Sequence, residues 1–105
     1  MLAMNLPVNE IKTLLNGLTS NLCNSIESGD REKALAVQKT FTATIATLWT
    51  SLEENEVDPK LKSVSRLVVG WAVHELPDQI LDPKNDEKVK RELKLFQRSL
   101  VLIDK

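Results

Sequence analysis

The residue types that do chemistry are few in this sequence and lie far apart. His74 is the only histidine and Cys23 the only cysteine of the 105 residues. Metal sites and catalytic pairs need several such side chains together, and a lone cysteine cannot form a disulfide within the chain. Cys23 is therefore interpreted as a small apolar core residue. We expect no catalytic, metal-binding or cofactor-binding residue and no bound cofactor.

The short motifs of common enzymes are also absent from the sequence. It contains neither GxSxG nor HExxH, and with three glycines it has no glycine-rich phosphate loop followed by a lysine. Pairs of carboxylates occur at Glu53–Glu54 and at Asp86–Glu87, but both pairs fall at the ends of predicted helices. Charges at such positions are solvated or compensate the helix dipole. The prediction is a protein that is not an enzyme.

One candidate binding surface lies on the outer side of the last predicted helix. Four basic side chains recur there at helical spacing and form a stripe opposite the apolar positions. Two leucines, seven residues apart, point away from the predicted core beside this stripe, and exposed leucines at helical spacing can receive a partner. A solvated surface without a partner is the alternative interpretation. The candidate binding residues are Lys90, Arg91, Lys94, Arg98, Leu95 and Leu102.

The composition fits a folded domain with nearly balanced charge. Hydrophobic residues make up 42% of the sequence and charged residues 28%, which is typical of globular proteins and unlike a disordered chain. The formal net charge is −1 and the pI is near 5.8, whereas dedicated nucleic-acid-binding domains carry a strong excess of positive charge. A protein partner or self-association is therefore the first hypothesis. RNA or another anionic surface, bound by the basic stripe, is the alternative.

Four predicted amphipathic helices position this surface, at about residues 7–28, 31–54, 59–76 and 83–103. In each of them apolar residues recur every three or four positions, which places them on one side of a helix. Residues 39–47 alternate threonine with apolar residues and by themselves resemble a strand. A lone strand would have no partner, so helix is the preferred interpretation. In the first helix the apolar positions are Val8, Ile11, Leu15, Leu18, Leu22 and Ile26, widened by Leu14 and Cys23.

Turn and capping residues separate these helices. Glycine in a left-handed conformation closes a helix, aspartate accepts hydrogen bonds from the free N–H groups of the next one, and proline is favoured in the first turn. Short connections between amphipathic helices predict one all-α domain over residues 1–105, either an antiparallel bundle or a small solenoid-like stack. The boundary signals are Gly29–Asp30, Asp58–Pro59, Pro77 and Asp82–Pro83.

The third predicted helix is apolar over more than half of its circumference. A helix that is apolar nearly all round is expected to be buried and to contact at least two neighbours. Gly70 would permit a close crossing with one of them. After Pro77 ends this helix, Ile80 and Leu81 are expected to pack against the core.

No segment of the sequence predicts export or membrane insertion. The N-terminal stretch MLAMNLPVNEI lacks the basic start and the continuous apolar run of a secretory signal, and Glu10 is unlike a transit peptide. No apolar run approaches the roughly 20 residues that a membrane span needs. With a single cysteine, which suggests no oxidising compartment, these features predict a cytoplasmic or nuclear protein without a transmembrane segment.

Residues 22–38, with the sequence LCNSIESGDREKALAVQ, form a helix end, a Gly-Asp turn and a helix start. This segment resembles the helical hairpin in the domain shared by the steroid receptor RNA activator protein and the C-terminus of the COPII coat protein Sec31. In that family the hairpin lies near the end of the bundle, and histidine often stands at the position of Gln38. The resemblance implies a non-catalytic, protein-binding scaffold or adaptor, as a component of a vesicle coat or a nuclear coregulator.

Overall fold

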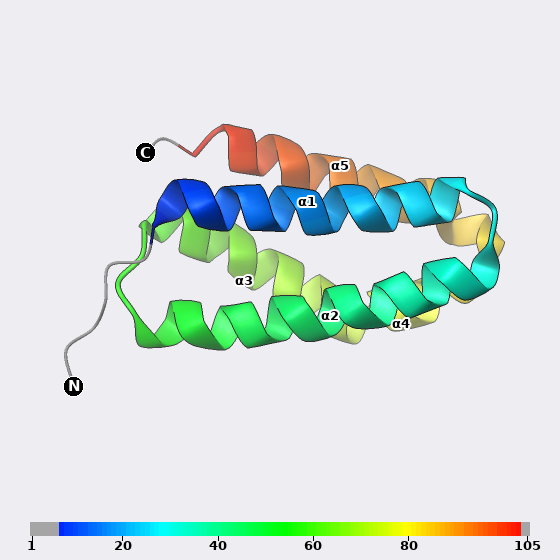
Figure 1. The fold of residues 1–105 in the computed structure, drawn as a ribbon, viewed down its shortest axis with the longest axis horizontal. Helices are drawn as coiled ribbons and strands as arrows, with labels where there is room; N and C mark the ends of the chain where they lie inside the picture. Colours follow the sequence, from blue (N-terminus) through cyan, green and yellow to red (C-terminus); the bar gives the residue numbers. More distant parts are fainter. Residues whose placement is uncertain (1–6, 104–105) are drawn as a thin grey trace.

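The computed structural model describes residues 7–103, which contain helices and no β-strand. The long helices run alternately up and down and form an antiparallel bundle, so the predicted all-α fold is confirmed (Figure 1). The N-terminal stretch in which we expect no leader includes residues 1–6, and these lie outside the described residues. The elements are α1 (Val8–Glu27), α2 (Arg31–Glu54), α3 (Pro59–His74), α4 (Leu76–Gln79), the 3-10 helix η1 (Pro83–Asn85) and α5 (Asp86–Val101).

Aspartate side chains cap the helix starts that the sequence predicts. The carboxylates of Asp30, Asp58 and Asp82 accept hydrogen bonds from backbone N–H groups two or three residues further on, at 2.8 to 3.1 Å. Gly29, just before the first of these caps, has a φ of 79°, which glycine adopts without the steric cost that a side chain would add. These local interactions fix where α2, α3 and η1 begin.

The threonine-rich segment 39–47 is helical, as predicted, and lies in the middle of α2. The hydroxyls of Thr47 and Thr50 donate to the carbonyls one turn earlier, at 3.0 and 3.2 Å. Thr42 instead donates to the carbonyl oxygen of Ala72 on α3, at 3.1 Å. Packing against the neighbouring helices therefore decides the conformation here, against the weak β-propensity of the segment.

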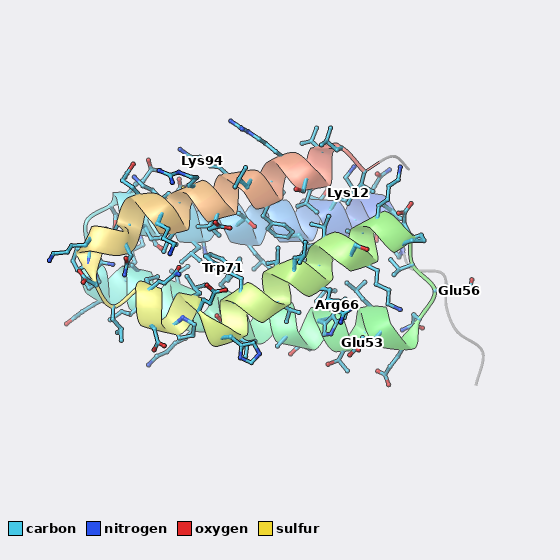
Figure 2. All side chains as sticks on the ribbon, turned by 180° about the vertical axis from the view of Figure 1, so that it is seen from behind. Lys12, Glu53, Glu56, Arg66, Trp71 and Lys94 are labelled. Atoms are coloured by element: carbon cyan, nitrogen blue, oxygen red, sulfur yellow. The ribbon has the colours of Figure 1, made fainter. Side chains whose placement is uncertain are left out.

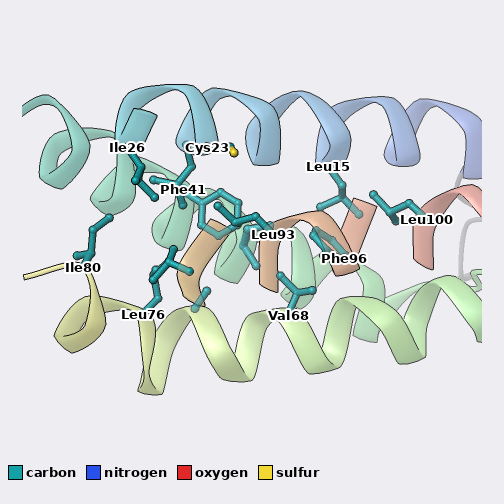
Figure 3. Packing of buried hydrophobic residues seen from close by; sticks show 14 of the residues in the cluster. Leu15, Cys23, Ile26, Phe41, Val68, Leu76, Ile80, Leu93, Phe96 and Leu100 are labelled. Carbon is teal, nitrogen blue, oxygen red and sulfur yellow. The ribbon is translucent and has the colours of Figure 1, made fainter. Parts of the chain in front are cut away.

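A single apolar core fills the space between the long helices (Figure 3). Every long helix contributes to it from residues spaced three or four positions apart. The larger side chains that are almost completely buried are Phe41, Leu15, Leu22, Leu52, Leu61, Leu76, Ile80, Leu93 and Val89.

Polar contacts fasten the helices at both ends of the bundle. At one end the guanidinium of Arg31 donates to the carbonyl oxygen of Ile80 at 3.0 Å and to the carboxylate of Asp86 at 2.8 Å. This hydrogen bond to Asp86 raises the pKa of Arg31 further above its usual range. At the other end the ammonium of Lys12 donates to the carbonyl oxygen of Ile103 at 2.7 Å. The start and the end of α5 are therefore both tied to other helices.

Two predictions about α3 are wrong. The helix contacts α2 and α5, as expected, but it is not buried all round, because the side chain of Leu67 is 75% exposed and that of Val73 is 43% exposed. Gly70 marks no close crossing, since a Cβ at this position would meet no atom within 4 Å. Helix α3 carries more apolar side chains than the core buries, so some of them lie on the surface.

Smaller errors concern single leucines and the end of α3. Ile80 is buried as predicted, but Leu81 is 64% exposed, and Leu14 is 46% exposed although it was expected to widen the core stripe of α1. The third helix ends at His74, and Leu76 begins the separate turn α4, because Pro77 fits the first turn of a new helix.

Candidate binding surface

The predicted binding residues come together on the outer side of α5. The core side of this helix consists of Val89, Leu93, Phe96 and Leu100, all buried. The opposite side has a shallow hollow, and its walls belong to α5 alone. The hollow is therefore a space between long side chains on one helix and not a cleft between two elements. It is lined by Glu87, Lys90, Arg91, Lys94, Leu95 and Arg98.

The four cations of the stripe are not equivalent. Lys90 is paired with Glu87, with 2.7 Å between the ammonium and the carboxylate, and its side chain is only 19% exposed. The same hydrogen bond raises the pKa of Lys90 and lowers the pKa of Glu87. Arg91, Lys94 and Arg98 are exposed and form no ion pair with any of residues 7–103. These three cations remain able to bind an anionic partner.

The two predicted surface leucines do point outward, as expected. Leu95 is 46% exposed, and Leu102, the residue that follows the last turn of α5, is 77% exposed. At 100° per residue, both lie next to Arg91 and Arg98 on the helix circumference, on the side away from Gln97. The surface therefore combines an apolar edge with a basic edge.

The flank of α5 that faces α1 is closed by polar contacts. The side-chain amide of Gln97 donates to the side-chain oxygen of Asn16 at 3.0 Å and to the hydroxyl of Ser20 at 2.8 Å. With the contact between Lys12 and Ile103, these hydrogen bonds bridge the two helices at two places, and a hollow lined in part by Leu100 and Val101 lies beside them. Leu95 and Leu102 lie on the outer surface of α5 and are turned away from this flank.

Sequence reasoning missed the contribution of α3 to this surface. Val64, Leu67 and Trp71 share one flank of α3, because they are three or four residues apart. Val64 and Trp71 are partly buried against the core, while Leu67 is largely exposed. The signal was present in the sequence as the excess of apolar residues in this helix, but it was interpreted as burial.

Neither His74 nor Cys23 belongs to a cluster of functional groups. His74 is exposed at the end of α3, and Cys23 is buried in the core, where desolvation raises the pKa of its thiol. Within residues 7–103, no three histidine, cysteine, aspartate or glutamate side chains gather as metal ligands would. No helix in this range combines the length and the apolar character that a membrane crossing requires.

Known proteins give no independent guide to this surface. The chain matches no family model, no curated protein and no solved structure. The outer face of α5 carries two exposed leucines bordered by cations that form no ion pair with the described part of the chain.

Proposed function

We propose that this chain is a non-catalytic protein-interaction module, of the scaffold or adaptor kind, which binds its partner on the outer face of α5. The observation that carries the proposal is the pair of exposed leucines beside three cations that form no ion pair within residues 7–103. Protein interfaces commonly combine an apolar centre with a polar rim, and arginine is enriched in them. Covering Leu95 and Leu102 would remove apolar surface from water, which favours association.

Binding of RNA or another anionic surface is the second candidate, and the unpaired cations favour it. Arg91, Lys94 and Arg98 would each contact a phosphate, and such a complex weakens steeply with salt through counterion release. The leucines favour a protein instead, because phosphate recognition makes no use of them. The net charge of −1 also gives little general attraction to nucleic acid.

The biological setting remains a prediction from the resemblance of residues 22–38. A cytoplasmic or nuclear adaptor in coat assembly or coregulation would need a rigid helical scaffold with one free face. The hairpin itself has the expected geometry, with a left-handed Gly29 followed by the cap Asp30. That geometry, which many helical hairpins share, supports the helical fold that the resemblance implies.

The test compares three double variants as baits for proteins and RNA from a cell lysate. Leu95→Ser with Leu102→Ser removes the apolar edge, and Lys94→Glu with Arg98→Glu reverses the basic edge. The matched control is Leu14→Ser with Val101→Ser, because these side chains are 46% and 78% exposed, against 46% and 77% for Leu95 and Leu102. Each bait is used at low and high salt after its fold is checked by circular dichroism.

We expect proteins that the parent and the control capture to be lost by the leucine variant. RNA captured by the parent, released at high salt and lost by the charge variant alone, would favour the second candidate. If both α5 variants fold and capture the same molecules as the parent, this face is not the binding surface and the proposal fails.

A further inference from the structure

Leucines of α3 and α5 lie at the same level along the bundle. Val68 of α3 and Phe96 of α5 line one small void in the core, so these two residues face each other across the interior (Figure 3). Leu67 and Leu95 are their neighbours in the sequence, and both are turned outward, with exposures of 75% and 46%. The two exposed leucines therefore lie at about the same level along the bundle and not at opposite ends of it.

The flanks of these helices also face each other. On α5, Gln97 contacts α1, and Leu95 lies on the opposite side of the helix circumference, so it borders the surface between α5 and α3. On α3 the residues Lys62 and Arg66 line a groove with Trp49 of α2, so the opposite flank, which carries Trp71, is the one toward α5.

Figure 2 shows the same arrangement from behind, with Trp71 on the α5 side of α3 and Arg66 on the α2 side. Both flanks that border the space between α3 and α5 thus carry exposed apolar side chains. We call this surface the α3–α5 seam; its residues are Val64, Leu67, Trp71, Leu95 and Leu102.

The charges around the α3–α5 seam are unequal on its two sides. The α5 side is bordered by Arg91, Lys94 and Arg98, whereas α3 contains no acidic residue between Pro59 and His74. A second copy of the chain would therefore bring these cations onto a helix without carboxylates, or onto one another. Glu92 also lies on the α3-facing flank of α5 and is exposed. Its carboxylate would be costly to bury, so a partner must leave it in solvent.

We propose that the partner of this module is an acidic amphipathic helix, which lies along the α3–α5 seam with its apolar face on Trp71 and the leucines and its acidic flank on the cations. The inference rests on the proposed function and adds the chemistry of the partner. Leu95 and Leu102 are about 10 Å apart along the axis, two helical turns. This spacing suits anchors at positions i, i+3, i+4 and i+7 of a helix in a groove.

The two tryptophans of the chain allow a direct test, because Trp49 of α2 lines the groove between α2 and α3, whereas Trp71 lies on the α5 side of α3. Trp49→Phe leaves Trp71 as the reporter of the α3–α5 seam, and Trp71→Phe leaves Trp49 as the reporter of the α2–α3 groove. The probe is a peptide of about 14 residues with leucines at i, i+3, i+4 and i+7 and with glutamate and alanine elsewhere. A peptide with lysine in place of every glutamate is its charge control.

We expect the glutamate peptide to shift the emission of Trp71 to the blue and to leave that of Trp49 unchanged. In the Trp49→Phe background, Leu95→Ser with Leu102→Ser and Lys94→Glu with Arg98→Glu are each expected to raise the Kd about tenfold or more. Lys33→Glu with Lys39→Glu, which changes the same charge on exposed positions of α2, is the matched control and leaves the Kd within about twofold. Added salt weakens binding of the parent as well.

Besides a glutamate peptide that fails to bind, three results would overturn this inference. The first is a lysine peptide that binds as tightly as the glutamate peptide, and the second is a response of Trp49 instead of Trp71. The third is a dimer in sedimentation that Leu95→Ser with Leu102→Ser abolishes, because a second copy would then cover the seam. The first result needs no variant, so it holds even if a double variant fails to fold. If the peptide fails but lysate proteins still depend on Leu95 and Leu102, only the acidic-helix partner is wrong. If that dependence is absent too, the proposed function falls with it.

Discussion

The two flanks of α5 differ in the contacts that their side chains form with the rest of the bundle. Toward α1, the amide of Gln97 donates to Asn16 and Ser20, and Lys12 donates to the last carbonyl of the bundle, at 2.7 to 3.0 Å. On the side of α3, no hydrogen bond to α5 is formed among residues 7–103, and Leu67 and Leu95 stay in contact with water. The α1 side is bridged by hydrogen bonds between side chains of the two helices, and the α3 side is not bridged in this way among the described residues.

This difference indicates which flank can gain from a partner. A molecule that inserted between α1 and α5 would have to replace hydrogen bonds already made, with little net gain. A molecule that covered the α3–α5 seam would bury leucine and tryptophan side chains without breaking any contact described here. The α1 flank thus attaches α5 to the fold by hydrogen bonds, and the side toward α3 is where our proposal places the partner.

The largest expected effect is the difference in stability between a substitution in the core under the α3–α5 seam and one in the seam itself. Phe96→Ala should lower the free energy of unfolding by about 3–5 kcal/mol, because Phe96 is 6% exposed and its removal leaves a cavity. Leu67→Ala should lower it by less than about 0.5 kcal/mol, since that side chain is 75% exposed. Urea unfolding of both variants measures the difference. A large loss for Leu67→Ala would mean that the seam holds the bundle together.

The next effect concerns the start of α5, which is held by the contacts of Arg31 and not by the side chains on either flank. Arg31→Met removes the links to Ile80 and Asp86 while keeping most of the aliphatic stem. We expect a loss of about 1–2 kcal/mol, reduced from the value for a buried pair because the two charged side chains are 30% and 24% exposed. Thermal unfolding at low and high salt measures it. An unchanged stability would show that packing alone positions α5.

The polar flank itself is tested by Gln97→Ala. The change leaves Asn16 and Ser20 facing α5 without their donor, and we expect a loss of about 0.5–1.5 kcal/mol. Leu95→Ala, two residues earlier on the other flank, serves as the comparison and should cost less. Chemical unfolding of the pair decides the order, and the reverse order would contradict the distinction between the flanks.

The smallest expected effect is an increase in stability, and the substitution that causes it lies in α3. The hydroxyl of Ser65 is buried and has no hydrogen-bond partner among the described residues. It lines the same small void as Val68 and Phe96. Ser65→Ala removes an unsatisfied polar group and raises helix propensity, so the midpoint of unfolding should rise by the equivalent of about 0.5–1 kcal/mol. A destabilised variant would indicate a partner for this hydroxyl.

Much of the fold was predictable because its signals are local. The Gly29–Asp30, Asp58–Pro59 and Asp82–Pro83 pairs fix helix boundaries within a few residues of themselves, and the three- or four-residue spacing on α5 correctly placed Leu95 and Leu102 outside the core. The pairing of Lys90 with Glu87, three positions away, also follows from local spacing.

The role of α3 was not predictable from the same signals. An apolar face looks the same in a sequence whether a neighbouring helix covers it or leaves it in water. Leu67 and Trp71 became part of the candidate site only through the side-by-side placement of α3 and α5. Their sequence separation gives no indication of that placement.

The contact between Lys12 and Ile103 joins positions 91 residues apart and has a consequence for the order of folding. The α1–α2 and α2–α3 hairpins close short loops, whereas docking of α5 on α1 closes nearly the whole chain, which costs more entropy. We therefore expect α5 to dock last during folding and to detach first in partial opening, so that its amides exchange with solvent ahead of those in α2. A circular permutant that links α5 directly to α1 would make this step local and faster.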